Sequence, residues 1–326
     1  MQTKTLQANC VVAVDLGGTR CRAALVDATG AVMAQRTLGT EVALTGLCAQ
    51  ILRLVSEFRA LAQAQSASVA GLCIGFPGVV HPQTQDIRMA PNLVEAEGLG
   101  LQAGLQAALG IPVQLENDVN LAALAELHAR SDDKPHSLVL LSVGTGLGSG
   151  LVLQGEVWQG RNGGAGEIGA LSLSAQGLRA LQHVQPTPTA PTVEDLVSGK
   201  GLARLYQTLR AQAGGASEPF DYRDLPQLFA QAQSGEHAAQ ESIRIAAQEL
   251  AHVVVQLEHV LNPTLYVLSG GLGARVEFLA EVNRALQASG LQVQASRFDS
   301  SAKPLGQDWA TPGQAGAAML ALARLP

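Results

Sequence analysis

Two stretches of the chain share one order of hydrophobic and polar positions. The first starts with an apolar run at 11–14, continues through a glycine-rich turn into an alternating run, turns at 27–30 and ends in a third run. The second starts at Leu138 and repeats this order through a turn at Gln154-Gly155 into a further short run. Short apolar or alternating runs that end at turns predict β-strands. Each stretch therefore predicts three strands joined by tight turns.

A helix and a further strand follow each set of three strands. Apolar residues recur at helical spacing over 47–63, and a buried strand is predicted at 69–74. After the second set, the same signals predict a helix at 242–261 and a strand at 265–269. This duplicated α/β plan predicts two domains of similar origin that face each other across a cleft.

The expected domain boundary lies near Asn120, just after a predicted strand at 113–116. We expect a small N-terminal domain at 1–120 and a larger C-terminal domain at 121–310. The last helix, within 311–326, starts with Thr-Pro-Gly-Gln, which matches a capping box with proline at the first helical position. We expect this helix to fold back onto the first domain.

Composition and charge exclude several classes of protein. Of the 326 residues 47% are hydrophobic, which is enough for a sizeable core and excludes intrinsic disorder. The net charge is −6 and no stretch gathers Lys and Arg, which argues against binding to duplex nucleic acid. The first ten residues do not resemble a leader peptide, and glycines interrupt the long apolar stretch at 138–153. We therefore expect a cytoplasmic protein without a membrane span.

The four cysteines are widely spaced and form no Cys-x-x-Cys pair. This spacing supports neither a disulfide framework nor a cysteine-based zinc site. We expect Cys10, Cys21, Cys48 and Cys73 to be small buried apolar residues.

Glycine is the residue in excess, with 35 copies where average usage of about 7% predicts about 23. One group stands in the sequence DLGGT, where Asp15 ends a predicted strand and Gly17, Gly18 and Thr19 follow. Glycine lets backbone N–H groups approach phosphate oxygens closely, and an acid at a strand end can hold a hydrated Mg²⁺. On its own this sequence is equally compatible with an ordinary hairpin.

A second glycine group, GTGLGSG, stands at the matching point of the second stretch and contains Gly144, Thr145 and Gly146. It is not a Walker loop, because no Gly-Lys-Ser/Thr follows. It is not a dinucleotide fingerprint either, because a strand rather than a helix follows it. Two glycine turns in matched positions predict a clamp for the polyphosphate of a nucleotide.

The candidate base is Asp118, in the sequence ENDVN between a predicted strand and a predicted helix. The dipole of a helix favours a negative charge at its N-terminus, and an ionised Asp can accept a proton from a hydroxyl nucleophile. Plain N-capping of the helix by Asn117 or Asp118 is the alternative.

Three further sites carry chemistry in this interpretation. Glu167 lies in the glycine-rich sequence GGAGEIG and Glu194 stands just before another glycine turn, so both could accept hydrogen bonds from sugar hydroxyls. Each is alternatively a solvated surface acid. Gly270 and Gly271, in SGGLG between a strand and a helix predicted at 274–286, would suit packing against a nucleoside.

The set of motifs resembles the ROK family of sugar kinases and repressors, within the actin-like ATPase (ribonuclease H-like) fold. The resemblance covers nearly the whole chain and includes GFPG at 75–78, APNL at 90–93 and the closing GAAMLAL helix. It implies an ATP-dependent kinase of glucokinase type and a homodimer. It also implies Asp118 as the general base on the 6-hydroxyl of a hexose, most simply glucose.

The resemblance assigns the remaining residues as well. The sugar would be bound by Asn92, Asn117, Asp118, Glu167 and Glu194. The phosphates of ATP and Mg²⁺ would be held by Asp15, which binds the metal indirectly, and by Gly17, Gly18, Thr19, Gly144, Thr145 and Gly146. The nucleoside would lie against Gly270 and Gly271.

The chain departs from the family at one point. Most members have a histidine directly after GEIG and downstream cysteines that together bind zinc, whereas this chain has Ala170 and no cysteine after Cys73. We therefore expect no zinc site, and a sugar contact of that histidine is lost. A kinase for another hexose or an N-acetylhexosamine, polyphosphate as donor, and a sugar-binding pseudokinase stay open as alternatives. A repressor is disfavoured because only 14 residues precede Asp15.

Overall fold

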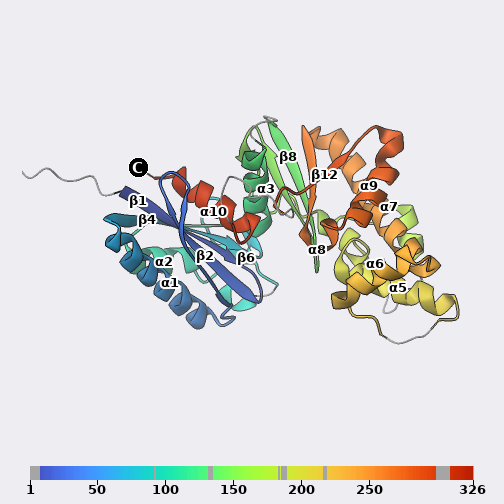
Figure 1. The fold of residues 1–326 in the computed structure, drawn as a ribbon, viewed down its shortest axis with the longest axis horizontal. Coiled ribbons are helices and arrows are strands. Elements are labelled where there is room, and N and C mark those ends of the chain that lie inside the picture. The colour runs from blue at the N-terminus through green and yellow to red at the C-terminus, as the bar shows by residue number, and fades with distance from the viewer. Residues whose placement is uncertain are drawn as a thin grey trace, which may run out of the picture. The chain divides into compact units, whose positions relative to one another are not determined.

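The computed structural model of the chain describes residues 8–91, 93–130, 135–182, 184, 189–215, 219–298 and 309–325 (Figure 1). The chain divides into two compact units. The first comprises the described residues of Met1–Lys134, Gly150–Ala165 and Ser301–Pro326, and the second those of Pro135–Ser149 and Gly166–Ser300.

Two five-stranded sheets with the same strand order organise the fold. The first has the order β3-β2-β1-β4-β7, and its strands are β1 (Ala8–Leu16), β2 (Arg20–Asp27), β3 (Val32–Gly39), β4 (Ala67–Phe76) and β7 (Val113–Asn117). The second has the order β10-β9-β8-β11-β12, and its strands are β8 (Ser137–Val143), β9 (Leu147–Leu153), β10 (Glu156–Val157), β11 (Leu265–Ser269) and β12 (Val293–Ala295). A small hairpin pairs β5 (Val79–Val80) with β6 (Ile87–Met89).

The pairing directions also match between the sheets. In the first, β1 is antiparallel to β2 and parallel to β4, which is parallel to β7. In the second, β8 is parallel to β11, which is parallel to β12, and β9 is antiparallel to β10. The predicted fold class, a duplicated α/β fold, is confirmed.

The helices complete both units. The α-helices are α1 (Leu44–Ala64), α2 (Leu101–Leu109), α3 (Asp118–Ala129), α4 (Ala175–Leu181), α5 (Gly199–Gln212), α6 (Leu225–Gln233), α7 (His237–Leu261), α8 (Gly270–Gly273), α9 (Val276–Leu286) and α10 (Pro312–Leu322). The 3-10 helices are η1 (Val94–Ala96), η2 (Ile168–Ala170), η3 (Val193–Asp195), η4 (Tyr222–Asp224) and η5 (Gln287–Ser289).

Most elements that the sequence predicts are present, with limits that differ by a few residues. One prediction was wrong in kind: the expected turn at 270–273 is the helical turn α8, and the next helix begins at Val276 rather than at 274. The Ala274 N–H donates to the Gly270 carbonyl at 2.7 Å, so the backbone closes a helical turn there.

The compact units have limits other than the expected domains at 1–120 and 121–310. The structure groups α3 and the segment Gly150–Ala165 with the first unit. A Cβ atom on Gly150 would lie 2.5 Å from the carbonyl oxygen of Val119, so this segment packs directly on α3. The last helix, α10, also belongs to the first unit.

The first sheet is covered on both faces. Side chains alternate along a strand, so Val12 and Val14 join the core beneath α1 and α2, while Val11 and Ala13 pack on the other side with residues of α10 such as Ala317. Figure 1 shows α1 and α2 on one face of this sheet and α10 on the opposite face. Continuous apolar runs, as in β1, are typical of strands buried on both faces.

Helix α10 lies unusually close to α3. A Cβ atom on Gly316 would lie 1.9 Å from the carbonyl oxygen of Leu121 in α3, so only glycine fits there. Thr311 caps α10 by accepting a hydrogen bond from the Gln314 N–H at 3.1 Å, and the amide oxygen of Gln314 accepts from the Ala310 N–H at 3.1 Å. The predicted Thr311 cap and the proline at the first helical position are therefore present, but the capping box is incomplete, because Gln314 accepts from Ala310 rather than from the Thr311 N–H.

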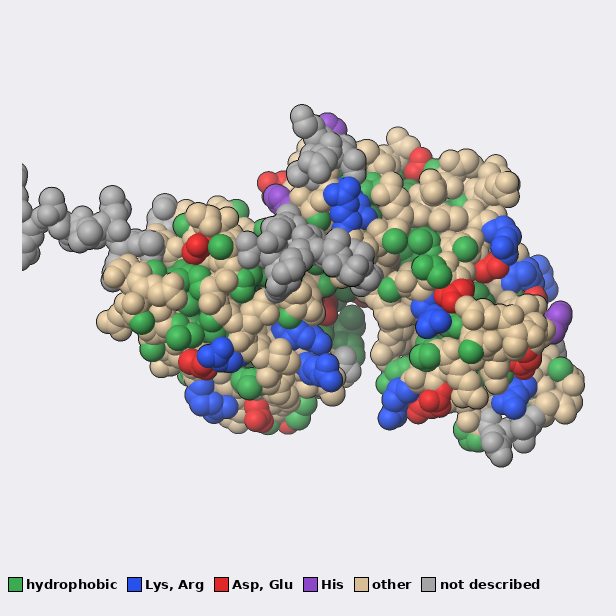
Figure 2. Space-filling model, in the orientation of Figure 1, with side chains coloured by type: hydrophobic (Ala, Val, Ile, Leu, Met, Phe, Trp, Pro, Cys, Tyr) green, Lys and Arg blue, Asp and Glu red, His purple; other side chains and the backbone are tan. Residues whose placement is uncertain are grey.

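Basic side chains are scattered over the face shown in Figure 2, and many of them lie next to acidic ones. The ion pairs among the described residues include Arg36–Glu57 and Arg223–Asp221. Among the described helices, none has the length and apolar character needed to cross a bilayer.

The contact between α10 and α3 yields a stability prediction. Gly316→Ala should lower the free energy of unfolding by about 3 kcal/mol, because the added methyl group collides with the backbone of α3. Gly104→Ala, in the exposed part of α2 with nothing within 4 Å of the new methyl group, should raise it by about 0.5–1 kcal/mol. Urea denaturation of both variants measures these changes, and equal midpoints for Gly316→Ala and the wild type would contradict the packing described.

Candidate functional site

The turn between β1 and β2 exposes the backbone of the first glycine group. The Gly17 N–H donates to the Arg20 carbonyl at 2.9 Å, and the hydroxyl of Thr40 donates to the Gly17 carbonyl at 2.6 Å. These bonds fix the turn from within, while Gly18 and Thr19 lie exposed at its tip. The turn therefore presents main chain without bulky side chains to a ligand.

Asp15, at the end of β1, is buried with 9% of its surface exposed. Its Oδ2 accepts a hydrogen bond from the Thr311 hydroxyl at 2.7 Å and lies 3.7 Å from the guanidinium of Arg22. Burial raises the pKa of this carboxyl, whereas the hydrogen bond from Thr311 and the charge of Arg22 lower it. Asp15 is thus a desolvated acid whose charge is stabilised by two neighbours.

The corner between β7 and α3 carries the candidate base. Asn117 is the N-cap of α3, because its Oδ1 accepts from the N–H groups of Val119 at 2.9 Å and Asn120 at 3.0 Å. Asp118 is the first residue of α3, and its Oδ1 also accepts from the Val119 N–H. Capping is therefore mainly the role of Asn117, and Asp118 stands in the first turn, as the sequence predicted.

The GFPG turn at 75–78 lies against this corner. The side-chain amide of Asn117 donates to the Gly78 carbonyl at 3.0 Å. A Cβ atom on Gly75 would lie 3.6 Å from the Cα atom of Asp118. The end of β4 therefore helps to hold the candidate base in place.

The side chain of Glu116 also holds the corner between β7 and α3, a role that the sequence did not reveal. Only 2% of its surface is exposed, and it accepts from the Asn117 N–H at 2.9 Å, the Asn120 side-chain amide at 2.9 Å and the Gln159 side-chain amide at 2.5 Å. Burial raises the pKa of Glu116, whereas the hydrogen bonds from these three donors lower it. The position of Glu116 next to Asn117 was the available signal, whereas nothing in the sequence marks Gln159.

In the second unit, the other glycine group forms the turn between β8 and β9. The Gly144 N–H donates to the Gly146 carbonyl at 2.9 Å, and the Gly199 N–H at the start of α5 donates to the Gly144 carbonyl at 2.7 Å. Thr145 is exposed at the tip. The two predicted turns thus occupy equivalent places in the two sheets.

Glu194 lies against this turn, and Glu167 lies close to Glu194. Glu194 accepts from the Leu147 N–H at 2.8 Å, and a Cβ atom on Gly146 would lie 2.6 Å from its Oε2. Burial and the nearby charge of Glu194 both raise the pKa of Glu167. A pair of carboxylates in this arrangement is suited to a ligand that offers several hydroxyl groups.

Backbone contacts hold the described residues just before Glu194. Thr192 and Asp195 form a capping box around η3, with the Thr192 N–H donating to Asp195 at 2.9 Å. Ser172 forms an isolated β-bridge with Thr192. Ala170 ends η2 with its side chain exposed.

Gly270 and Gly271 begin α8 beside the end of β8. Gly270 has a φ of +88°, and a Cβ atom there would lie 2.6 Å from the Val143 carbonyl oxygen, so this position requires glycine. Gly271 is exposed, with nothing within 4 Å of an added Cβ. Asn92, predicted to bind sugar, lies outside the described residues. Within the described ranges, His, Cys, Asp and Glu form no group of three that could hold a metal ion.

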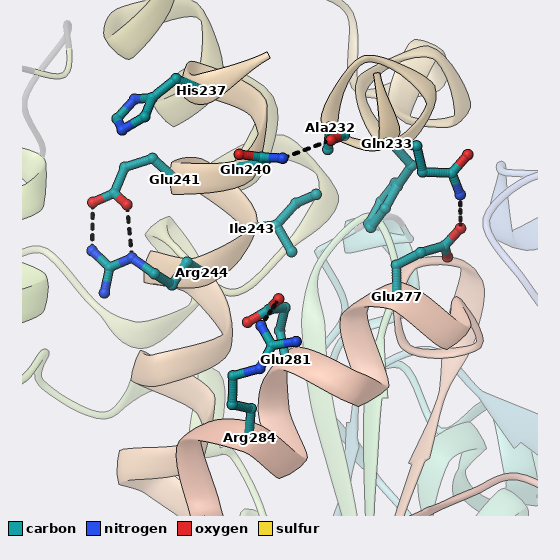
Figure 3. Close-up of a pocket in the computed structure, with 11 residues that line it drawn as sticks. Ala232, Gln233, His237, Gln240, Glu241, Ile243, Arg244, Glu277, Glu281 and Arg284 are labelled. Atoms are coloured by element: carbon teal, nitrogen blue, oxygen red, sulfur yellow. Dashed lines mark hydrogen bonds and ion pairs between the residues drawn. The ribbon is translucent and has the colours of Figure 1, made fainter. Parts of the chain in front are cut away.

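A pocket of about 460 Å³ lies elsewhere in the second unit, between α6, α7 and α9 (Figure 3). It contains none of the predicted site residues. Its charged side chains are paired with one another: Arg244 with Glu241, Arg284 with Glu281, and Glu277 with the Gln233 amide at 2.7 Å. The charged side chains that line this pocket therefore already have neighbouring side chains as partners.

Comparisons with known proteins relate these features to sugar kinases. N-acetyl-D-glucosamine kinase of Salmonella paratyphi A is 30% identical over 267 residues, which cover 79% of this chain and 82% of the relative. Glucokinase of Halalkalibacterium halodurans is 25% identical over 307 residues, 91% of both chains. The crystal structure of a ROK hexokinase from Thermus thermophilus is 26% identical, with a TM-score of 0.77 over 96% of this chain and 98% of that one.

The sequence profile of the ROK family matches residues 11–324, which include both glycine turns, Asp118 and the start of α10. The motifs, the duplicated sheets and this match agree, and the chain belongs to the ROK family.

Proposed function

We propose that the chain transfers the γ-phosphoryl group of ATP to the 6-hydroxyl of a hexose, with glucose as the first candidate. The observation that carries this proposal is the place of Asp118, in the first turn of α3 and beside the helix start that also contacts Asp15. A sugar kinase needs a proton acceptor near a phosphate-binding turn, and the first unit offers both.

Asp118 acts as the general base in this proposal. It accepts the proton of the sugar hydroxyl as the hydroxyl oxygen attacks the γ-phosphorus, and the bond from phosphorus to the bridging oxygen of ADP breaks. A negative charge in the first turn of a helix is favoured by the helix dipole. Asn117 and Glu116 hold this turn through partly buried hydrogen bonds, which keeps the base oriented.

The sugar hydroxyls are bound by Asn117, Glu167 and Glu194, and we keep Asn92 as an expected contact. Carboxylate and amide oxygens accept hydrogen bonds from hydroxyl groups, and an amide also donates. The raised pKa of Glu167 supports this role, because a desolvated carboxylate beside a second one gains from hydroxyl donors.

The nucleotide is bound by the two glycine turns. Gly17, Gly18 and Thr19 in one unit and Gly144, Thr145 and Gly146 in the other present backbone N–H groups to phosphates, and Gly270 and Gly271 lie against the nucleoside. Asp15 fits a hydrated Mg²⁺, because a buried carboxylate with a raised pKa is stabilised by a nearby cation. When bound, Mg²⁺ neutralises charge on the phosphates.

An acceptor panel with a matched variant tests this function. ADP release should be stimulated by glucose or, given the 30% identity to an N-acetyl-D-glucosamine kinase, by an N-acetylhexosamine. Asp118→Asn should lower kcat on the best sugar by about 10²- to 10⁴-fold, the usual worth of a general base, while sugar affinity changes little. Asp86→Asn, in the loop between β5 and β6, is the control with wild-type turnover. No stimulation by any sugar in the panel would favour a binding protein and overturn the kinase proposal.

The contact between Gly146 and Glu194 predicts a specific loss of sugar binding. The methyl group of Gly146→Ala would displace the Glu194 carboxylate from the Leu147 N–H, because it would lie 2.6 Å from Oε2. Sugar affinity, measured by isothermal titration calorimetry, should fall by roughly tenfold, the worth of one hydrogen bond to a charged group. Gly104→Ala is the control, and equal sugar affinities in the two variants would remove Glu194 from the sugar site.

The raised pKa of Glu167 predicts a pH dependence of sugar binding. Protonation removes a hydrogen-bond acceptor, so affinity should fall as the pH drops through the pKa of Glu167, which is higher than that of an ordinary glutamate. Glu194→Gln removes the neighbouring charge and should move this fall to lower pH. Titrations of sugar binding at acidic to neutral pH measure the shift, and an unchanged profile would show that Glu167 does not control binding.

A further inference from the structure

The carboxylate of Asp15 depends on a residue from the far end of the chain. The Thr311 hydroxyl donates to Oδ2 at 2.7 Å, whereas the guanidinium of Arg22 lies 3.7 Å from the same oxygen, beyond hydrogen-bond distance. Among the described residues, Thr311 is therefore the hydrogen-bond donor to Asp15, and Arg22 acts through its charge alone.

The cap of α10 fixes the direction of this hydrogen bond. Thr311 accepts from the Gln314 N–H at 3.1 Å, which occupies a lone pair of the hydroxyl oxygen. Its single hydrogen is then directed to Asp15. The next residue, Pro312, has no N–H that could compete for the carboxylate.

The start of α10 also approaches the second oxygen of Asp15. A Cβ atom on Gly313 would lie 3.0 Å from Oδ1 and 3.5 Å from the carbonyl oxygen of Asp118. The absence of a side chain at Gly313 therefore keeps Oδ1 clear. With Oδ2 engaged by Thr311, Oδ1 is the oxygen that remains for a ligand.

We propose that Thr311 is a positioning residue for nucleotide binding: its hydroxyl holds Oδ2 of Asp15 and so fixes the orientation of the carboxylate that would hold the hydrated Mg²⁺ accompanying the phosphates. This inference rests on the proposed function. Without this hydroxyl, no hydrogen bond from a described side chain would fix the rotation of the buried carboxylate. Thr311 thus couples the packing of α10 to the phosphate turn.

Other charged groups also lie near Asp15. The guanidinium of Arg22 on β2 lies 3.7 Å from Oδ2. Asp118 contributes its backbone carbonyl beside Gly313. Thr311→Val leaves these residues unsubstituted.

Thr311→Val, which removes the hydroxyl at nearly constant volume, tests the proposal against Thr311→Ser, which keeps it. Calorimetric affinity for ADP in the presence of Mg²⁺, without sugar, should fall by roughly tenfold in Thr311→Val and recover in Thr311→Ser, as expected for one hydrogen bond to a charged group.

Ser174→Ala is the matched structural control. Ser174 caps α4 by accepting from the Gly177 N–H at 3.0 Å and donates to the buried Glu249 at 2.6 Å, so it makes the same two bonds away from the phosphate turn. We expect a similar loss of melting temperature in Ser174→Ala and Thr311→Val, but a change in Mg·ADP affinity only in Thr311→Val. Wild-type Mg·ADP affinity in Thr311→Val would overturn this inference alone. Failure of the wild type to bind Mg·ADP would overturn the proposed function together with it.

Discussion

The close contact of α10 with α3 is the constraint on which the first unit depends. Gly316 lies against the carbonyl oxygen of Leu121, and one helical turn earlier Gly313 lies beside Asp15 and Asp118. Side chains at these points would push the helices apart. Because α10 also covers one face of the first sheet, the packing of the core and the placement of the two acids result from the same contact.

The first unit contains more than one buried acid, and each accepts hydrogen bonds from neighbouring donors. Asp15 and Glu116 both have pKa values raised by burial, and hydrogen bonds to each of them act in the opposite direction. A raised folded-state pKa means that ionisation opposes folding: stability falls as the pH rises from the unfolded-state pKa to the folded-state pKa. Ionisation of such buried acids destabilises the fold, and acids with shifted pKa values are typical of functional sites.

In the second unit, two carboxylates lie close to each other. Glu167 and Glu194 are close enough for the charge of one to raise the pKa of the other, and Glu194 is stabilised by the Leu147 N–H. The capping box of Thr192 and Asp195 holds the segment in place. Backbone capping therefore helps to position Glu194 in this chain.

The sequence by itself determined the fold class and the position of the candidate base at a helix start, because both are encoded locally. Alternation, apolar runs and glycine turns predicted strands such as β1 and β8, and the sequence ENDVN placed Asp118 at the start of a helix. The helical turn α8 was missed, because glycine favours turns in general. At Gly270 the close approach of the Val143 carbonyl excludes any side chain. The tertiary structure alone decided which distant residues meet: Gln159 with Glu116, and Thr311 with Asp15 across 296 positions of sequence. No local pattern specifies such partners, since they are chosen by how helices pack on a sheet.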